Sequence, residues 1–557
     1  MSSQAKNQGH STPLRRGKAC LNCRHLKIKC DGVKPTCGPC RRMPKADPCE
    51  FNDSLSRTQE LEHTVFRLQS QLNELQGGGG GVWPSSAAPG SPFSGSSAGG
   101  SSDGSFLGFQ EPPLVVIESL LRSFLPHATQ FGFFLHPTRF RDAALLPFAF
   151  GDERRPSPAL LCVVYLWGIH LSQSQPFLSS EPLFLKRAQE HIATEISANV
   201  PPLHVIHTIQ AQVLLTTYLF HNKRFLEAEF HANGAATLVM GHQYHKIRSA
   251  RSASPPLFGL TAAAQDSSVQ EGERIRGFWA VATLQSNLHI ALHSGSGTSL
   301  CILESLANID APWPLEISDY EAGALHPGYR GQETVRRFLA EDGSGPLGPI
   351  AMLHAKASVL LYRAVRLASN WAPDMQPHAR ASYITSYTRL DRRITQFWET
   401  LPPIYALYPT SPDADSGPAR ALVVVHALTA AAAIRLHRGP NSSDIDQSAA
   451  GKSVFAARAI LECLGDARVG AHRAVVAPIA GTLGTLACRV VMEEARSAET
   501  FRISWAASVG AQVGPPGEEE RALRGDVQRG LQIMGVYAAG SPLIGAEADE
   551  LGGGKVE

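Results

Sequence analysis

Alternating apolar and polar residues, the pattern of half-buried β-strands, are scarce in this 557-residue chain. Long unbroken apolar runs are lacking too. The two longest, around residues 159–171 and 421–434, are interrupted by histidine or too short to cross a bilayer. We therefore expect both runs to be buried helices, and we expect no association with a membrane. Residues 1–6 are polar and basic, without the apolar centre of a secretory signal, which argues against a secreted, disulfide-rich protein.

Catalytic motifs are also lacking. The pairs His204/His207 and His242/His245 have i, i+3 spacing, but no H-E-x-x-H or carboxylate pattern accompanies them. The Gly/Ser run at 294–297 has no preceding strand and no Lys-Ser/Thr, so it does not fit a phosphate-binding loop. The four cysteines beyond residue 50 are isolated and fit buried, reduced thiols, with redox sensing as the alternative. We expect no enzyme.

Cysteine is instead concentrated near the start of the chain, in the pattern C-x2-C-x6-C-x6-C-x2-C-x8-C. The six residues are Cys20, Cys23, Cys30, Cys37, Cys40 and Cys49. The intervals are too short to build a hydrophobic core, so a metal is expected to organise the segment. Two tetrahedral zinc ions need eight thiolate positions, which six cysteines supply if two sulfurs bridge.

Other interpretations of these cysteines fit less well. A thioredoxin-like C-x-x-C would stand beside a βαβ pattern, which is missing here. A four-cysteine zinc ribbon or LIM-type site usually separates its two C-x-x-C pairs by about 12–20 residues. Thirteen residues separate the pairs here, but Cys30 lies in the middle of them.

Charge is distributed unevenly along the chain. Residues 1–50 hold eleven Lys/Arg and three Asp/Glu, a net charge of +8, whereas the whole chain has +2 and the remainder therefore −6. Two zinc ions on six thiolates would add about −2, which leaves this segment positive. A basic head on a slightly acidic body is typical of a nucleic-acid-binding protein.

Residues 19–37, ACLNCRHLKIKCDGVKPTC, resemble the DNA-binding motif of fungal binuclear zinc-cluster transcription factors. The similarity lies in the basic run between the second and third cysteines, the Cys-Asp-Gly that follows, and the proline two residues before the fourth cysteine. The resemblance implies that Cys20 and Cys37 bridge the two Zn²⁺ ions. The second and third cysteines would complete one site, and the fifth and sixth the other.

The resemblance also implies that a short helix carrying Lys27 enters the major groove of double-stranded DNA and reads a CGG triplet. Leu26 stands where many family members have a second basic residue, so we expect base contact to depend more heavily on Lys27. We expect four further cations to contact phosphates, with a solvated charge as the alternative for each. They are Arg24, Lys29, Arg41 and Arg42.

A short heptad pattern follows the cysteines. Leu61, Val65, Leu68, Leu72 and Leu75 are spaced 4, 3, 4 and 3 residues apart. Val65 and Leu72 occupy a positions and the other three d positions, which favours a parallel two-stranded coiled coil. The alternative is a single amphipathic helix packed on the body. We expect a homodimer that reads paired triplets, because dimer geometry sets half-site spacing.

The domain plan follows from these patterns and from composition. Residues 77–105 are almost all Gly, Ser, Pro and Ala and fit a flexible linker, and the apolar spacing beyond them is helical. Residues 115–320 resemble the fungal regulatory region that accompanies such zinc clusters, most clearly at 209–234, 273–280 and 308–314. The expected parts are a disordered basic arm (1–18), the zinc cluster (19–50), a linker (51–57), the coiled-coil helix (58–76), the second linker (77–105), an all-α regulatory domain (106–540) and a disordered tail (541–557).

These observations favour a nuclear, zinc-dependent regulator of RNA polymerase II transcription that recruits the transcription machinery. One alternative is a protein-interaction scaffold in which zinc only staples the fold. The other is a receptor for an unknown small-molecule effector with secondary DNA binding. The charge bias of residues 1–50 argues against the scaffold.

Overall fold

The computed structural model divides into two compact units, Met1–Pro89 and Gly90–Glu557, called here the head and the body. It describes the following residues: 20, 23, 27–31, 33–34, 36–42, 49, 111–172, 175–197, 202–251, 267–292, 301–340, 348–372, 374–407, 417–439, 445–466, 477–538 and 540–553. The expected basic arm, coiled coil and both linkers lie outside these residues.

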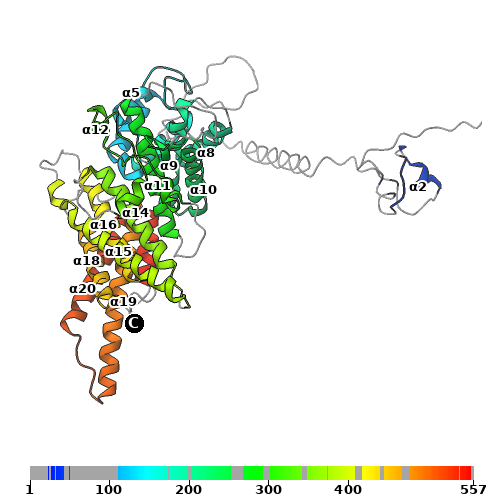
Figure 1. Ribbon diagram of the computed structural model, residues 1–557. Helices are drawn as coiled ribbons and strands as arrows, with labels where there is room; N and C mark the ends of the chain where they lie inside the picture. Colours follow the sequence, from blue (N-terminus) through cyan, green and yellow to red (C-terminus); the bar gives the residue numbers. More distant parts are fainter. Residues whose placement is uncertain are drawn as a thin grey trace, which may run out of the picture. The chain divides into compact units, whose positions relative to one another are not determined.

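The head has one described helix, α2 (Gly38–Arg42), and a helical residue at Cys23. The body is made of α-helices (Figure 1) and of short 3₁₀ helices, which are denoted η here. Its first half contains α4 (Leu114–Phe124), η1 (Leu125–Phe131), α5 (Pro137–Ala144), α6 (Pro158–Ser172), α7 (Gln175–Leu178), α8 (Glu181–Ser197), α9 (Pro202–His221), α10 (Phe225–Gly241), η2 (Tyr244–Lys246), α11 (Ser268–Leu292), η3 (Ile302–Glu304), η4 (Leu306–Asn308), α12 (Ile317–Glu321) and α13 (Thr334–Ala340). Its second half contains α14 (Ile350–Ser369), α15 (Pro377–Thr400), η5 (Ile404–Leu407), α16 (Gly417–His437), α18 (Ala449–Gly465), α19 (Ile479–Ser508), α20 (Glu518–Ala538) and α21 (Pro542–Gly553).

Within the described ranges the body has no β-strand. Its one extended pairing is an isolated parallel bridge between Ser249 and Gly331. The expectation of a helical body is therefore confirmed for these residues. Helix α15 ends at Thr400, immediately before Leu401 and the pair Pro402-Pro403, which cannot continue a helix.

A tight turn joins α9 to α10. Lys223 adopts a left-handed conformation with φ of 61°, and the Arg224 amide donates to the Leu219 carbonyl at 2.8 Å. This six-residue bond closes the end of α9 in the manner of a Schellman motif. The chain can then begin α10 at Phe225, antiparallel to α9 and packed against it.

The two longest apolar runs form buried helices. In α6 every residue from Ala159 to Ile169 is buried, because the helix is apolar on all sides. Helix α16 is, among the described helices, long and apolar enough to cross a membrane by length and composition, but 83% of its apolar window is buried inside the body. It packs mainly between α14 and α18, so its apolar surface serves the core of the body.

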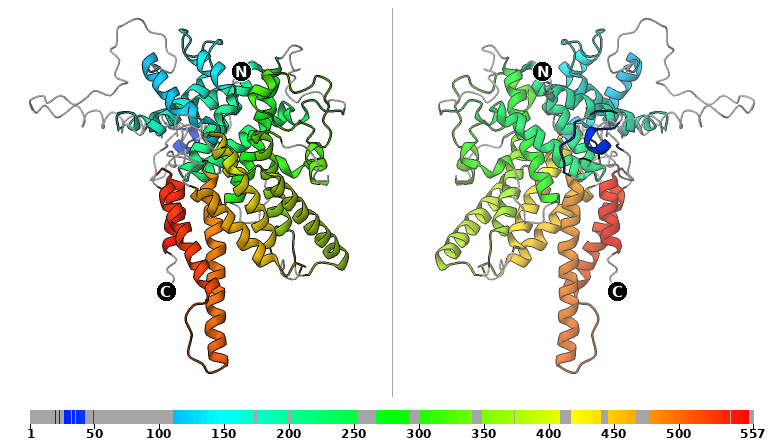
Figure 2. Two further views of the ribbon diagram at one scale, coloured as in Figure 1. Left: turned by 90° about the vertical axis from the view of Figure 1, so that its left-hand side faces the viewer. Right: turned by 90° about the vertical axis from the view of Figure 1, so that its right-hand side faces the viewer.

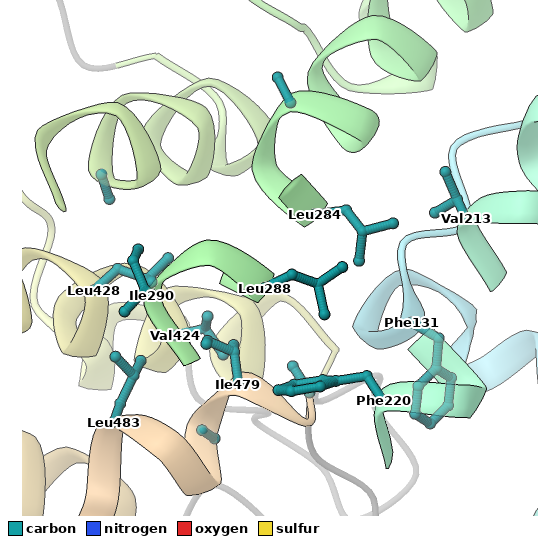
Figure 3. Packing of buried hydrophobic residues seen from close by; sticks show 14 of the residues in the cluster. Phe131, Val213, Phe220, Leu284, Leu288, Ile290, Val424, Leu428, Ile479 and Leu483 are labelled. Carbon is teal, nitrogen blue, oxygen red and sulfur yellow. The ribbon is translucent and has the colours of Figure 1, made fainter. Parts of the chain in front are cut away.

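Side chains from both halves of the body meet in one hydrophobic core. Figure 3 shows Phe131 of η1, Phe220 of α9, Leu288 of α11, Val424 of α16 and Ile479 of α19 converging in this region. Helix α11 packs against α9 and α10 on one side and against α14 and α19 on the other. The part that resembles a fungal regulatory region and the part beyond residue 320 are therefore one folded body.

The last helices differ from expectation. Residues 541–557 are predicted to be a disordered tail, but Pro542–Gly553 form α21, with Leu543, Ile544 and Leu551 buried. Helix α21 packs against α19 and α20. A Cβ at Gly481 of α19 would lie only 2.5 Å from Ile544 Cγ1, so the absence of a side chain there permits this close approach. The tail prediction is wrong for these residues. A short acidic segment is ordered when tertiary packing buries its few apolar side chains, as α19 and α20 do here.

Helices α19 and α20 form an antiparallel pair, and Figure 2 shows the far end of α19 extending past the other helices of the body. Arg502 joins the two helices through Glu520, with Nε 2.8 Å from the carboxylate.

Candidate metal centre and nucleic-acid interface

The six head cysteines come together in space as two groups of four. One group contains Cys20, Cys23, Cys30 and Cys37, and within it all the sulfur atoms lie within 4.8 Å of one another. The other group contains Cys20 and Cys37 again, with Cys40 and Cys49, under the same limit. Two cysteines are thus common to both groups. Among the residues that the structure describes in either unit, no other set of three or more potential ligands gathers in this way.

The spacing of the sulfur atoms suits zinc. The Sγ atoms of Cys20 and Cys37 are 3.6 Å apart, those of Cys23 and Cys37 3.5 Å, and those of Cys20 and Cys40 3.8 Å. Tetrahedral zinc with Zn–S bonds of about 2.3 Å requires sulfurs roughly 3.8 Å apart. These separations are far longer than a disulfide bond of about 2.05 Å.

Because these thiols are buried, their deprotonated form depends on a bound cation. It raises the pKa of Cys20, raises that of Cys23 to about 12, and raises that of Cys37 well above its usual range. Without a cation, buried thiols at neutral pH would keep their protons. Zinc binding displaces those protons, so metal affinity supplies the folding free energy that a core this small cannot.

Backbone amides support the sulfur atoms. The Cys23 amide donates to the Cys20 sulfur at 3.4 Å, and the Cys37 amide donates to the Cys49 sulfur at 3.3 Å. Cys37 directly precedes α2, and its carbonyl accepts from the Arg41 amide at 2.9 Å. One shared cysteine therefore also starts the helix whose first turn carries Cys40.

Asp31 connects the two halves of the head. Its carboxylate accepts from the Gly38 amide at 2.9 Å and from the Val33 amide at 3.3 Å, and the first of these bonds chiefly lowers the pKa of Asp31. It thereby holds the segment after Cys30 against the beginning of α2. A Cβ at Gly38 would lie 2.3 Å from the Asp31 carboxylate, so any other residue here would displace the carboxylate from this position. Sequence reasoning missed both roles, since a cap seven residues away matches no local capping pattern.

The structure corrects the setting of Lys27. The family resemblance implies a short helix that carries Lys27, but Lys27 is left-handed with φ of 53°, and the Ile28 amide donates to the Cys23 carbonyl at 3.0 Å. This pattern is typical of the residue just after a helix end. Lys27 therefore lies at the turn that follows Cys23, where a chain reversal and not a helix face sets the direction of its side chain.

The other expected DNA-contacting residues are partly described. Lys29, Arg41 and Arg42 are exposed, as is Lys27, and Arg41 and Arg42 form the last turn of α2. Exposed cations thus follow both C-x-x-C pairs: Lys27 and Lys29 come after the first pair, and Arg41 and Arg42 come after the second. Arg24 lies outside the described residues. The same holds for the dimerisation residues Leu61, Val65, Leu68, Leu72 and Leu75.

The histidine pairs of the body have the environment of packed side chains. The rings of His204 and His207 stack with centroids 5.9 Å apart, and the Ser157 amide donates to His207 Nδ1 at 3.4 Å. Burial lowers the pKa of His207 to about 4. His242 Nδ1 lies 2.9 Å from the Leu238 carbonyl of its own helix. Burial also raises the pKa of the four body cysteines to about 11 or 12, which leaves them as unreactive thiols.

Comparison with known proteins identifies the head. Residues 18–58 match the model of the fungal Zn(2)-Cys(6) binuclear cluster domain, so this part of the chain carries a domain that binds two zinc ions. The chain is also 36% identical over 74 residues to the transcriptional activator protein acu-15 of Neurospora crassa. That match spans 12% of this chain and only 8% of the length of the relative. No solved structure matches the chain. The family model ends at residue 58, so the resemblance of residues 115–320 to a regulatory region stays a prediction.

Proposed function

We propose that this protein is a nuclear, zinc-dependent transcription factor that binds specific DNA sequences at RNA polymerase II promoters. The observation that carries the proposal is the pair of four-sulfur groups sharing Cys20 and Cys37, within a segment that matches a fungal zinc-cluster domain. The net charge of +8 over residues 1–50 supports DNA as the partner, because phosphate neutralisation is the main source of affinity for DNA.

In this proposal Cys20 and Cys37 each bind both zinc ions. Cys23 and Cys30 complete the first site, and the remaining two cysteines complete the second. The zinc ions replace a hydrophobic core and fix the turn after Cys23 relative to α2. Asp31 adds the one described carboxylate bond between these two parts of the head.

The cations of the head divide into two roles. Lys27, exposed at the turn, donates to the O6 and N7 atoms of a guanine in the major groove and reads a CGG triplet. Lys29, Arg41 and Arg42 contact phosphates, as does Arg24, and so fix the register without reading sequence. Lys27 has a left-handed backbone, at the turn that directly follows the zinc ligand Cys23.

Residues 58–76 would form the parallel coiled coil of a homodimer, so that two heads read two triplets. A flexible linker of seven residues, 51–57, spans about 15 Å and limits how far apart the two heads can reach. The preferred spacing of the triplets therefore follows from the linker and the coil.

Selection from randomised duplex DNA with the zinc-loaded, full-length chain tests this function. We expect enrichment of paired CGG triplets at one preferred spacing, and binding that falls steeply with added salt because phosphate contacts release counterions. Enrichment of single triplets would contradict the dimer. If nothing were enriched and binding to DNA were insensitive to salt, the protein would instead be a zinc-stapled interaction scaffold. The same chain stripped of zinc by a chelator is the matched control.

A further inference from the structure

The body has a cavity of about 710 Å³ that is partly open to solvent and is bordered mainly by α14, α16, α19 and α21. Small-molecule sites usually fall in the range of about 300–1,000 Å³. Because α14 and α16 come from the middle of the chain and α21 from its last residues, this space exists only in the assembled body.

The cavity is lined by both apolar and charged side chains. Ile290, Val365 and Leu486 are among the apolar ones. The charged ones are three arginines and three glutamates. They are Arg435, Arg438, Arg489, Glu493, Glu547 and Glu550. A lining of this kind suits a ligand with an ionic group at one end and an apolar group at the other.

Two of the three arginines are already neutralised. Arg438 lies 2.8 Å from a Glu493 oxygen and 3.2 Å from a Glu494 oxygen. Arg489 Nη2 lies 2.7 Å from the Glu550 carboxylate. The charges of Glu493 and Glu550 are therefore also neutralised, each by its arginine partner.

Arg435 is different. Within the described part of the chain it has no ion pair and no hydrogen-bond acceptor, and its Nε atom is buried without a partner. Burial, together with the nearby charge of Arg489, lowers its pKa, and no carboxylate acts in the opposite direction. A guanidinium cannot lose its proton under ordinary conditions, so Arg435 is an uncompensated, partly buried cation at the wall of this cavity. The missing counter-charge is the group that a ligand would supply.

The walls also restrict which anion fits. Glutamate carboxylates line the same space, so a dianion such as phosphate would meet more repulsion than a monoanion. Among these glutamates, Glu547 repels a bound anion least, because burial raises its pKa to about 7 and so favours its neutral form. Its Oε1 accepts from Thr482 Oγ1 at 3.1 Å, and its Oε2 has no partner among the described residues. Arginine matches a planar carboxylate in particular, through two parallel N–H···O bonds.

We propose that this cavity binds a small monocarboxylate with an apolar tail, its carboxylate paired with Arg435 and its tail against Ile290, Val365 and Leu486. Binding there would stabilise the packing of α21 and α19 on α14 and α16. The inference concerns the body alone and does not depend on the proposed DNA binding.

Thermal unfolding of the zinc-loaded, full-length chain tests the proposal with three probes at equal ionic strength: phenylacetate, its neutral analogue phenylacetamide, and inorganic phosphate. We expect phenylacetate to raise the Tm saturably, by about 2 °C or more, because a ligand that binds only the folded state stabilises it. The amide and phosphate should leave the Tm unchanged. An unresponsive wild-type chain, or an equal response to phosphate, would overturn the proposal.

The variant Arg435→Met assigns the response to this residue. We expect it to abolish the phenylacetate shift while leaving the Tm of the ligand-free chain equal or higher, because an uncompensated cation is removed. The matched control is Arg529→Met on α20, where the arginine is exposed and away from the cavity lining, and this variant should keep the full shift. If Arg435→Met lowered the ligand-free Tm by several degrees, or kept the phenylacetate response, the site would be disproved.

Discussion

Single residues carry unequal weight in the head. Cys20 and Cys37 belong to both sulfur groups, whereas each of the other four cysteines belongs to one. Loss of a shared sulfur therefore affects two ion sites, and loss of an unshared sulfur affects one. This inequality is a measurable consequence of the proposed bridging.

The variant Cys37→Ala should lose both zinc ions, and DNA binding with them, because it removes a ligand from each site. Cys49→Ala is the matched control: it disturbs one group only and should keep up to one zinc ion per chain. Zinc measured by elemental analysis of the purified chains distinguishes the two. A Cys37→Ala chain that kept two zinc ions and bound DNA would refute the bridging assignment.

Lys27→Ala should weaken binding to the CGG triplet by about 1–3 kcal/mol and leave zinc content unchanged. Alanine is disfavoured in the left-handed conformation found there, so Lys27→Gly serves as a second variant without that backbone cost. Both variants should lose the same affinity in titrations with labelled duplex DNA. Loss of zinc from Lys27→Gly would show that the lysine has a folding role instead.

At the scale of elements, helices that are apolar on several sides form where the sequence predicts them. Helix α21, in contrast, forms where the sequence predicts a disordered tail. The burial of helices α6 and α16 is predictable from their apolar composition alone. Helix α21 has few apolar residues. It is ordered because it packs on α19, where Gly481 permits the close approach of Ile544. Its stability therefore depends on contacts far away in sequence.

Ile544→Ala tests the docking of α21. Ile544 is 1% exposed and packs beside Gly481, so its truncation should lower the free energy of unfolding of the body by about 2–5 kcal/mol. The control Val536→Ala, at a residue that is 44% exposed on α20, should change it by less than about 0.5 kcal/mol. Urea unfolding curves measure both. Equal small effects would mean that α21 contributes little to the stability of the body.

At the scale of the whole body, several buried histidines make folding sensitive to acid. Burial lowers the pKa of His207, His245 and His354 to about 4, and that of His221 to about 3. The unfolded chain binds protons at these histidines near pH 6.5, well before the folded chain does. Their contribution to stability is therefore complete above about pH 6.5 and declines as the pH falls toward 4.

We expect the Tm of the body to fall by several degrees between pH 6.5 and pH 4.5. Glu547, whose pKa is raised to about 7, and Glu273, whose pKa is also raised by burial, act in the opposite direction because folding favours their protonated forms. The histidines whose pKa is lowered by burial outnumber these two glutamates. His354→Leu should reduce the acid sensitivity, while His378→Leu, at an exposed position, should not. Calorimetry over this pH range decides the matter. An unchanged slope in His354→Leu would show that this histidine is not protonated on unfolding.

Much of this protein was predictable because its determinants are local. The zinc-binding domain follows from the spacing of six cysteines, since thiolate chemistry and tetrahedral geometry leave few other arrangements. The helical body follows from apolar periodicity, and the end of α15 follows from Pro402-Pro403. Each of these features is decided within a few turns of chain, so neighbouring residues suffice to specify it.

The remaining features required the tertiary structure. The Asp31–Gly38 link, the docking of α21 and the unpaired charge of Arg435 all depend on segments brought together by folding. Sequence can show that arginine and glutamate are present, but not which pairs form. Only the packed body shows that Arg438 and Arg489 have partners and Arg435 has none within its described residues, because ion pairing depends on distances of a few ångströms between helices.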